Sequence, residues 1–346
     1  MPNSQQHILV SGAAGFIGSW ITEGLLKEGY GVIGVDNLSG GFIENLPKGN
    51  AANNFKFHKI DIAEYDVMDE IFAAHKPHVV YHCAAQAHEG ASYMDPYRIV
   101  RSNSLISSVI FELAIKHGVG KIVYFSSMAR YGKNKVPFTE DMKCRGVDPY
   151  GLQKIACEEM LAMLSDVHGI KYTIVVPRNV FGPRQAMDDL YRNFITIVCN
   201  RILRGDPIYL YGAGKSIRSF SYIADSLPCF LKVADTEKYN KEIFNIGGTQ
   251  PVSVLEAAKE IISHFPGCES EIIDLPPRYG EVEVAYASYE KATKILGFEE
   301  KVGWQSGIAK TVEWSKQKGR QEWRKYFLPL KTESMPLPWR EFSKKS

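Results

Sequence analysis

Across its first 180 residues the chain alternates short β-branched runs with longer amphipathic stretches. We expect strands at HILVSG, GVIGVD, FKFHKID, HVVYHCAA, KIVYFSS and YTIVVPR. Helices are expected between them, over residues 16–28, 67–75, 103–117 and 150–168. The strands are apolar along most of their length, which is typical of a parallel sheet covered by helices on both faces. The pattern therefore predicts an α/β fold with a Rossmann-type doubly wound parallel sheet.

The alternation loosens after Arg178, where glycine and proline interrupt the chain at FGPRQ, RGDPIYLYGAGKS, NIGGTQP and LPPRYGE. Helices are predicted there over residues 191–203, 253–264 and 288–296. We expect a smaller α/β substrate-binding domain at the carboxyl edge of the sheet. The predicted division gives residues 1–176 and 213–247 to the Rossmann domain, and 177–212 and 248–335 to the substrate domain. The Pro-rich tail, residues 336–346, is predicted to be a surface extension.

Charge and cysteine content argue against several classes of protein. The 346 residues carry 41 Lys and Arg against 39 Asp and Glu, without a long basic run, so no nucleic-acid partner is predicted. The six cysteines lack CxxC spacing and the nine histidines are dispersed, which argues against a metal site, a metal hydrolase or a disulfide framework. We find no signal-peptide pattern and no run near the roughly 18 apolar residues of a membrane span. A cytoplasmic protein without a membrane partner is expected.

A glycine-rich turn follows the first predicted strand, in ILVSGAAGFIGSWITEGLL. Gly12, Gly15 and Gly18 allow a tight turn and bring backbone N–H groups to a pyrophosphate at a helix N-terminus. Asp36 closes the next strand, where a carboxylate can bind the hydroxyls of an adenosine ribose. Asn37 follows it instead of an arginine, so NAD is favoured over NADP. The alternative is a plain strand–helix turn without a ligand.

A possible acid–base pair lies in DPYGLQKIACEEML, where Tyr150 and Lys154 are four residues apart and share a helix face. A nearby ammonium is expected to lower the pKa of the phenol from its usual value of about 10. Such a tyrosine can take a proton from a sugar hydroxyl and return it. Ser127 ends the fifth predicted strand, at the sheet edge where ligands bind. A solvated helix face explains the Tyr–Lys spacing equally well when it stands alone.

Taken together, these motifs resemble the NAD-dependent nucleotide-sugar epimerases and dehydratases of the extended short-chain dehydrogenase/reductase superfamily, and most of all the UDP-hexose 4-epimerases. The resemblance runs from Ile8 to about Trp314. The segments that carry it are GAAGFIG, YHCAAQA, FSSMARYG, PYGLQK, PRNVFGPRQ, IYLYGAGKSIRSFSYIAD, FNIGG and RYGEV.

The resemblance assigns roles to individual residues of this sequence. It implies that Ser127, Tyr150 and Lys154 form the catalytic set, which Asn103 supports. Further implied cofactor contacts are Phe16, Ile17, Asn37, Asp61, Ile62, Ala84, Ala85, Asn103, Tyr150, Lys154 and Pro177. The implied substrate contacts are Ser127, Tyr150, Asn179, Asn193, Arg218, Arg278 and Glu281. The two arginines suit a diphosphate, because a guanidinium matches phosphate oxygens with two parallel hydrogen bonds. A surface charge is the alternative for each arginine taken singly, and an ordinary exposed strand end is the alternative for Asp61.

Two residues without an acidic or basic side chain restrict the type of reaction that the resemblance implies. Similar sugar 4,6-dehydratases place Asp and Glu after the catalytic serine or threonine, whereas this chain has Met128 and Ala129. Elimination of water therefore lacks an acid and a base at these positions. The sequence favours a nucleotide-sugar 4-epimerase, of the UDP-glucose/UDP-galactose type, that acts through a transient 4-keto sugar. Ala285 stands where bulky residues exclude N-acetylated hexoses, which predicts room for them, although a plain strand alanine is an equal explanation.

Other readings stay open at this point. The same residues suit a nucleotide-sugar 4-dehydrogenase or 4-ketoreductase, whose product leaves before the hydride returns. A non-catalytic NAD-binding regulatory protein is disfavoured, because Ser127, Tyr150 and Lys154 are all present. The resemblance also implies a homodimer paired through the helices of Asn103 and Tyr150. The apolar stretch SSVIFELAI suits such pairing, and it suits ordinary core packing as well.

Overall fold

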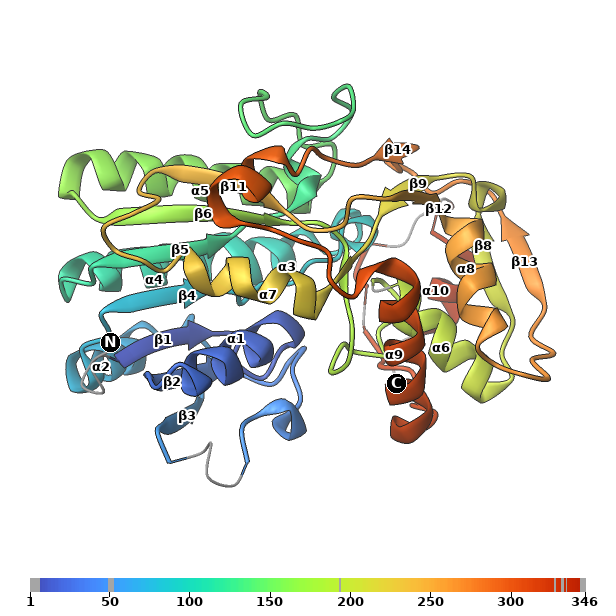
Figure 1. Ribbon diagram of the computed structural model, residues 1–346, viewed down its shortest axis with the longest axis horizontal. Coiled ribbons are helices and arrows are strands. Elements are labelled where there is room, and N and C mark those ends of the chain that lie inside the picture. The colour runs from blue at the N-terminus through green and yellow to red at the C-terminus, as the bar shows by residue number, and fades with distance from the viewer. Residues whose placement is uncertain are drawn as a thin grey trace.

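The computed structural model describes residues 7–48, 53–192, 194–326, 328–330, 333 and 335–342. Its centre is a seven-stranded, wholly parallel sheet in the order β11-β6-β5-β4-β1-β2-β3 (Figure 1). The strands are β1 His7–Ser11, β2 Gly31–Asp36, β3 Phe55–Lys59, β4 Val79–His82, β5 Lys121–Phe125, β6 Lys171–Pro177 and β11 Glu242–Ile246. The order reverses at β1, beside β4, so the switch point of a doubly wound sheet lies there.

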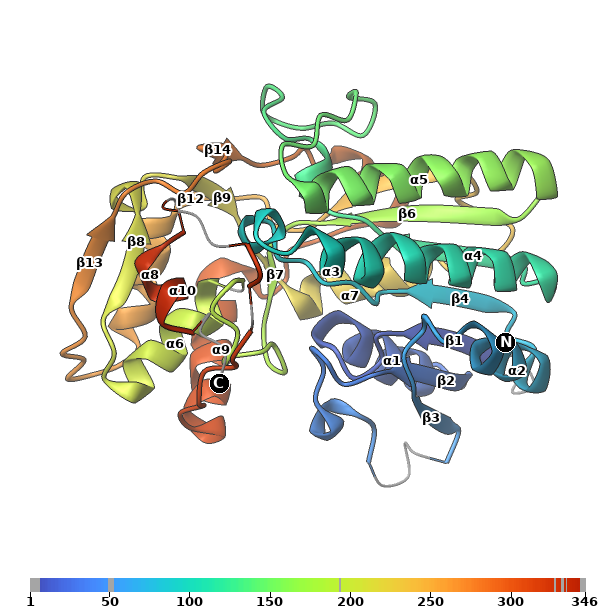
Figure 2. The same ribbon diagram turned by 180° about the vertical axis from the view of Figure 1, so that it is seen from behind.

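Helices cover both faces of the sheet, which explains the buried, continuously apolar strands (Figures 1 and 2). On one face α1 packs against α7, and on the other α4 packs between α2 and α5. The helices are α1 Phe16–Lys27, α2 Tyr65–His75, α3 Pro96–Val100, α4 Ile106–Lys116, α5 Pro149–His168 and α7 Ile223–Lys232. The predicted Rossmann-type fold is confirmed.

A second lobe stands beyond the carboxyl ends of these strands (Figure 1). Helices α6, α8 and α9 pack on one another there and share a hydrophobic core with small sheets. Its helices are α6 Phe194–Arg204, α8 Val254–Ser263, α9 Gly303–Lys318 and α10 Leu337–Phe342. Its strands are β7 Val180–Phe181, β8 Ile208–Tyr211, β9 Ile217–Ser219, β10 Ser221–Tyr222, β12 Pro251–Ser253, β13 Ile272–Leu275 and β14 Val284–Ala285. No helix among the described ranges is long and apolar enough to cross a membrane.

The chain passes between the two lobes more than once after β6. Strand β9 joins β12 and β14 in a three-stranded sheet, while α7 and β11 return to the seven-stranded layer. The division of the chain at residues 213–247 remains a prediction.

The C-terminal tail differs from the predicted surface extension. Met335 is 2% exposed and Trp339 is 3% exposed, and both join a hydrophobic cluster with Tyr191, Tyr326 and Leu328. The prediction was wrong because the prolines were taken as a sign of exposure, whereas Met335 and Trp339, on either side of them, pack against the turn after β4 and the loop before α6.

Candidate active site

A cleft of about 430 Å³ lies between the sheet edge and the second lobe, and we call it the sugar cleft. A smaller cleft of about 230 Å³ lies over the carboxyl ends of β1 and β2, and we call it the cofactor cleft. The two clefts share lining residues, among them Phe16, Ile17 and Arg192. They therefore form one continuous site at the edge of the sheet where parallel strands bind ligands.

The glycine turn between β1 and α1 is dictated by close backbone packing. Gly12 has a φ of +73°, and a side chain on Gly18 would place its Cβ 2.1 Å from the Gly12 carbonyl oxygen. The turn brings Gly15 to the start of α1 as its N-cap, where no side chain caps the helix. The first backbone N–H groups of α1 thus point towards the cofactor cleft without a side-chain acceptor, which suits a pyrophosphate.

Asp36 stands at the end of β2 in the same cleft. Its carboxylate accepts hydrogen bonds from the Ala14 and Leu38 amides at 3.0 and 2.7 Å, and burial raises its pKa. A carboxylate fixed in this way matches the ribose hydroxyls of a dinucleotide. The uncapped helix start and this carboxylate together fit NAD.

The remaining predicted cofactor residues divide between the two clefts. Those in the cofactor cleft are Gly12, Gly15, Phe16, Ile17, Gly18, Asp36, Asn37, Asp61, Ile62, Ala84 and Ala85. Pro177, Tyr150 and Lys154 line the sugar cleft. Asp61 is half-buried and forms an ion pair with Arg101 at 2.8 Å. Burial acts to raise its pKa, but the Ala63 amide and the Arg101 charge outweigh burial and lower it.

Asn103 lies behind the clefts rather than on their walls. It sits in a π-helical turn, Arg101–Leu105, and its amide donates to the Gln86 and Ile99 carbonyls at 3.2 and 2.9 Å. Its Oδ1 is buried and has no hydrogen-bond partner among the described residues. Asn103 therefore holds the segment after β4 in place, as a supporting residue would.

Tyr150 and Lys154 occupy the first turns of α5. Asp148 caps this helix by accepting from the Gly151 amide at 2.7 Å, and Pro149 occupies its first position. Tyr150 is 3% exposed and Lys154 is 2% exposed, yet both line the sugar cleft. The helix start thus places the phenol at the carboxyl edge of β5.

The pKa of Tyr150 differs from the sequence prediction. Burial, followed by the negative charge of Glu89, raises the pKa of the phenol, while Arg192 and a hydrogen bond with Ser127 act to lower it. The Lys154 ammonium donates to the Phe125 carbonyl at 2.7 Å and lies 5.9 Å from the centre of the Tyr150 ring. The prediction that the pKa of Tyr150 is lowered was wrong for the protein without its cofactor, because desolvation of the phenol outweighs the effect of the nearby cations. Burial also lowers the pKa of Lys154 to about 8.

Ser127 begins a 3₁₀ turn, Met128–Arg130, directly after β5. Its hydroxyl accepts from the Ala129 amide at 3.2 Å and faces the sugar cleft beside Met128 and Ala129. Beneath this turn Arg130 and Glu158 form a buried ion pair at 2.9 Å, and Ser126 donates to the same glutamate. This buried network anchors the turn that carries Ser127.

Arg218, Arg278 and Glu281 converge at the far end of the sugar cleft. The Glu281 carboxylate lies 3.7 Å from Arg218 and 3.2 Å from Arg278, and Arg278 also stacks on the Tyr211 ring at 4.7 Å. One carboxylate shared by two guanidiniums leaves the cluster with an excess positive charge, which suits a diphosphate.

Asn179 lines the same cleft and donates to the Ser219 carbonyl at 2.9 Å. Its φ of +36° is rare for a residue other than glycine, and such conformations gather at functional sites. Asn193, the remaining predicted substrate contact, lies outside the described residues.

The structure brings charged residues into the sugar cleft that sequence reasoning missed, namely Glu89, Asp148, Arg192 and Arg201. Burial raises the pKa of Asp148 to about 6. The Glu89 carboxylate faces the cleft and forms no ion pair with any residue that the structure describes. The sequence carried no signal for Glu89, because the turn after β4 has no motif of its own. Asp148 was visible as an N-cap, directly before the Pro149 that starts the helix.

Comparison with known proteins places this geometry in context. The model of the NAD dependent epimerase/dehydratase family matches residues 8–247. UDP-glucose 4-epimerase of Mycolicibacterium smegmatis is 32% identical over 314 residues, covering 90% of this chain and 99% of that protein. A dTDP-D-glucose 4,6-dehydratase and a UDP-N-acetyl-alpha-D-glucosaminuronate decarboxylase match at 29% and 30% identity, so identity alone does not separate these reactions.

Solved structures give the same picture. UDP-glucose 4-epimerase of Thermotoga maritima with UDP-glucose superposes with a TM-score of 0.84 at 36% identity, covering 90% of this chain and 99% of that one. The UDP-glucose 4-epimerase of Thermus thermophilus in complex with NAD gives 0.83 at 30% identity, with the same coverage. The prediction of NAD as the cofactor is confirmed.

Proposed function

The chain belongs to the NAD-dependent epimerase/dehydratase family, and on that premise we propose that it is a nucleotide-sugar 4-epimerase acting on UDP-hexoses. The observation that carries this proposal is the composition of the turn after β5. Ser127 and Tyr150 face the sugar cleft there, and the two positions that follow Ser127 are Met128 and Ala129. The site can thus move a proton at a hydroxyl but has no acid–base pair in the turn for eliminating water.

Tyr150 is the proposed acid–base residue. As phenolate it accepts the proton of the sugar 4-hydroxyl, directly or through Ser127. It later returns that proton to the C4 oxygen, when the hydride is returned to the opposite face of the C4 carbonyl. When bound, NAD would supply the hydride acceptor and donor, and its oxidised ring would add a positive charge to those that the chain already places near the phenol. A positive charge favours the phenolate, which offsets the burial that raises the pKa of Tyr150.

The other residues of the site are proposed to bind the cofactor and the nucleotide sugar. Gly12, Gly15, Gly18 and Asp36 are proposed to bind the dinucleotide, and Lys154, whose ammonium lies 5.9 Å from the centre of the Tyr150 ring, is proposed to orient it. Arg218 and Arg278 are proposed to bind the diphosphate and Glu281 the nucleoside ribose, with Asn179 beside the phosphates. The roles of Asn103 and Asn193 stay as predicted from the sequence.

N-acetylated hexoses are proposed as further substrates. Ala285 is half-buried in β14 and lines the sugar cleft, so a small side chain stands on the wall where a larger one would narrow it. Turnover of UDP-N-acetylglucosamine beside UDP-glucose tests this point, and strict rejection of the acetylated sugar would remove it.

The purified protein, incubated with a panel of UDP-, dTDP-, GDP- and CDP-hexoses, tests the main proposal. We expect NMR to show the C4 epimer of a UDP-hexose, with no net formation of NADH. Stoichiometric NADH would indicate a 4-dehydrogenase instead, and a 4-keto-6-deoxy product would indicate a dehydratase. Recovery of unchanged sugar from the whole panel would support the non-catalytic reading.

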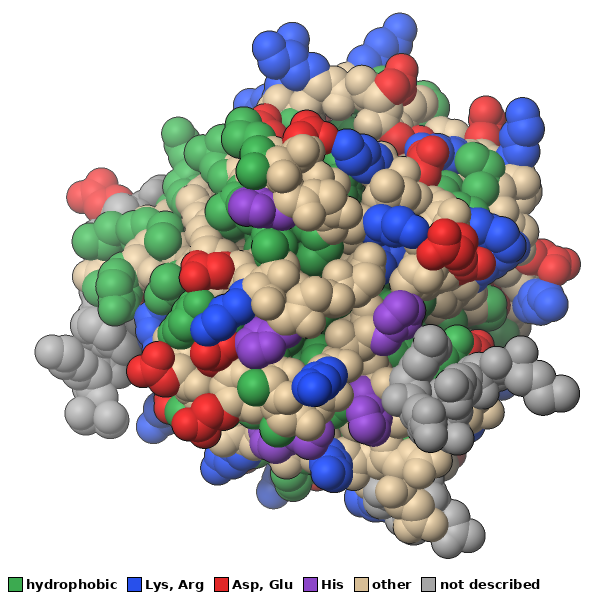
Figure 3. All heavy atoms as spheres, turned by 90° about the vertical axis from the view of Figure 1, so that its left-hand side faces the viewer, with side chains coloured by type: hydrophobic (Ala, Val, Ile, Leu, Met, Phe, Trp, Pro, Cys, Tyr) green, Lys and Arg blue, Asp and Glu red, His purple; other side chains and the backbone are tan. Residues whose placement is uncertain are grey.

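A homodimer through α4 and α5 remains part of the proposal. These helices lie side by side on the outer face of the sheet (Figure 2), and hydrophobic side chains gather along one flank of the molecule (Figure 3). The large hydrophobic residues exposed on α5 are Leu152, Met163 and Val167, and those exposed on the segment that leads into α4 are Tyr97, Val100 and Leu105. Such a set favours burial against a second copy. Sedimentation of wild type and of Met163→Asp checks it, with loss of the dimer expected in the variant.

A further inference from the structure

The segment that follows α9 crosses both clefts, and we call it the C-terminal strap. The name refers only to its described residues, 320–326, 328–330, 333 and 335–342. The motifs of the family resemblance all precede it, and about a tenth of this chain lies outside its alignment with the bacterial epimerases. Tyr326 lines the cofactor cleft, whereas Pro338 and Trp339 line the sugar cleft.

The strap begins with firm attachments to α6. Gln321 exchanges two hydrogen bonds with the buried side chain of Asn200, at 2.8 and 3.0 Å. The Trp323 indole donates to Asp206 at 3.1 Å, and the Arg201 guanidinium stacks on its ring at 5.1 Å. The start of the strap is therefore fixed by polar groups that have exchanged their hydrogen bonds to water for these contacts.

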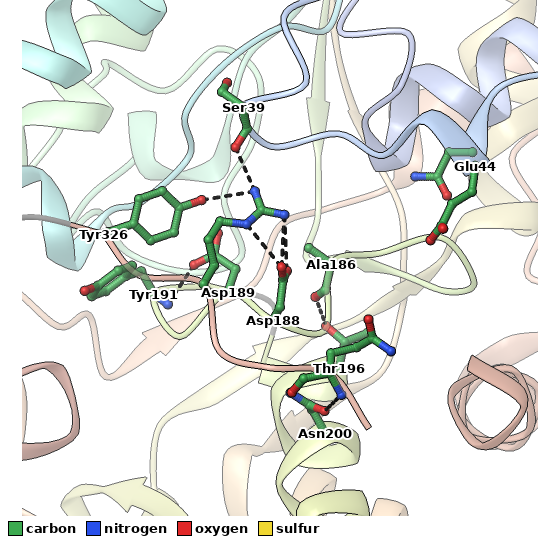
Figure 4. Close-up of polar contacts among 12 residues, drawn as sticks. Ser39, Glu44, Ala186, Asp188, Asp189, Tyr191, Thr196, Asn200 and Tyr326 are labelled. Carbon is green, nitrogen blue, oxygen red and sulfur yellow. Dashed lines mark hydrogen bonds and ion pairs between the residues drawn. The ribbon is translucent and has the colours of Figure 1, made fainter. Parts of the chain in front are cut away.

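Arg324 then ties the loop after β2 to the loop before α6. Its guanidinium donates to both carboxylate oxygens of Asp188, at 3.2 and 3.3 Å, and to the Ser39 carbonyl at 2.7 Å. Figure 4 shows Asp188, Ser39 and Tyr326 converging on this guanidinium. Ser39 lies in the loop after β2 that lines the cofactor cleft, and Asp188 lies in the loop before α6. A planar fork with several donors is needed to serve both loops at once.

The end of the strap packs against aromatic rings in the sugar cleft. Tyr326 and Trp339 contact the Tyr191 ring edge-on, with centroids 5.4 and 4.9 Å apart. A side chain on Gly90 would place its Cβ 2.8 Å from the Trp339 ring, so this glycine leaves the space that the indole fills. Tyr326 also packs on His88, which is paired with Asp189 at 2.7 Å.

From this arrangement we infer that the C-terminal strap is a fixed wall of the active site, in which Arg324 and Tyr326 are positioning residues that retain NAD and Trp339 limits the space for the sugar. The inference rests on the proposed function and deepens it. An epimerase must keep its oxidised sugar and its cofactor enclosed until the same turnover ends, and a wall tied to both cleft loops opposes the opening that would release them.

Retention of NAD tests the positioning role without any sugar present. Wild type, Arg324→Ala and Arg320→Ala are loaded with NAD, separated from free cofactor, and assayed over time for NAD bound per chain. We expect Arg324→Ala to release NAD at least about tenfold faster, the scale of lost charge-assisted hydrogen bonds. Arg320 is exposed, and its side chain forms no ion pair with a residue that the structure describes, so Arg320→Ala should match wild type. Equal release from wild type and Arg324→Ala would overturn the inference.

If circular dichroism shows that Arg324→Ala is not folded, two milder variants replace it in the test. Arg324→Lys keeps the charge but cannot donate to both Asp188 oxygens and Ser39 together, and Asp188→Asn removes the charge from the partner. Both should release NAD faster than wild type, and the double variant should add little to either. Unchanged release from both would overturn the positioning role. Since no sugar takes part, a wrong reaction assignment leaves these outcomes unaffected.

The wall role of Trp339 is tested by substrate range. Trp339→Ala should raise kcat/KM for UDP-N-acetylglucosamine relative to UDP-glucose by at least about threefold, because removal of an indole widens the cleft. Trp339→Phe, which keeps an aromatic ring there, should lie closer to wild type. An unchanged ratio in Trp339→Ala would overturn this part.

Discussion

The cofactor cleft and the sugar cleft meet at Phe16, Ile17 and Arg192, but different parts of the chain build them. The core of the cofactor cleft comes from two short segments, residues 12–18 and 36–41, together with the ends of β3 and β4. Its shape is set by backbone, above all where Gly18 packs against the Gly12 carbonyl. The sugar cleft instead collects side chains from β5, α5, β9 and the segment before β14, while the C-terminal strap contributes to both clefts.

This difference shows how each cleft can change. A cleft shaped by backbone tolerates few substitutions, since any added atom meets main chain that cannot move aside. A cleft shaped by side chains can alter its specificity one residue at a time while the fold stays intact. The following experiments test that contrast.

Tyr150→Phe should have the largest effect. Loss of the phenolic hydroxyl takes away the only proposed proton acceptor. The value of kcat should therefore fall by about 10²–10⁴, the usual contribution of acid–base catalysis. NAD should stay bound, as measured by mass analysis of the purified variant. Tyr289→Phe, at an exposed position away from both clefts, is the matched control. Substantial epimerase activity in Tyr150→Phe would mean that another group is the base.

Gly18→Ala should damage the cofactor cleft specifically. Its Cβ would lie 2.1 Å from the Gly12 oxygen, and the resulting overpacking typically costs about 1–3 kcal/mol, or roughly 5- to 150-fold in NAD affinity. Gly24→Ala in the same helix is the control, because its Cβ would meet only the movable end of the Leu231 side chain. Calorimetric titration with NAD measures both, and equal affinities would break the claim that backbone defines this cleft.

Arg278→Ala should weaken substrate binding while leaving the chemistry in place. A hydrogen bond to a charged group contributes about 1.5–3 kcal/mol, so KM for the UDP-sugar should rise about tenfold or more with little change in kcat. Arg145→Ala, an exposed arginine outside both clefts, should behave as wild type. A fall in kcat at unchanged KM would place Arg278 in the reaction itself.

Glu89→Gln should give the smallest effect, on pH dependence. The Glu89 carboxylate disfavours a negative phenolate and so raises the pKa of Tyr150. Its neutralisation should lower that pKa and move the rising, acidic limb of the kcat/KM profile to lower pH. Glu70→Gln, exposed on α2, is the control. A limb that moves to higher pH would contradict the assigned electrostatics.

Much of the architecture could be predicted from the sequence. The strand candidates appear as β1 to β6, because continuous apolar runs can only be buried between two helical layers. The fold class and NAD followed from the same local patterns, as did the placement of Arg218 and Arg278 once a family resemblance was available.

Other features had no local signal. The burial of Trp339 and Met335 depends on a surface that the turn after β4 and the loop before α6 create, and the tail was therefore predicted wrongly. The pKa of Tyr150 was also predicted in the wrong direction. Spacing along a helix identifies Lys154 as a neighbour, but it gives neither the depth of burial nor the position of Glu89.

The amino-acid sequence alone determined the order of strands and helices, the glycine turn and the acidic end of β2. These depend on sterics and periodicity within a few residues, which act before the chain is folded. Only the tertiary structure decided which charges face the phenol and how the C-terminal strap joins the two clefts. Desolvation and Coulomb interactions act through space, so they are set by segments that meet only when the lobes are assembled.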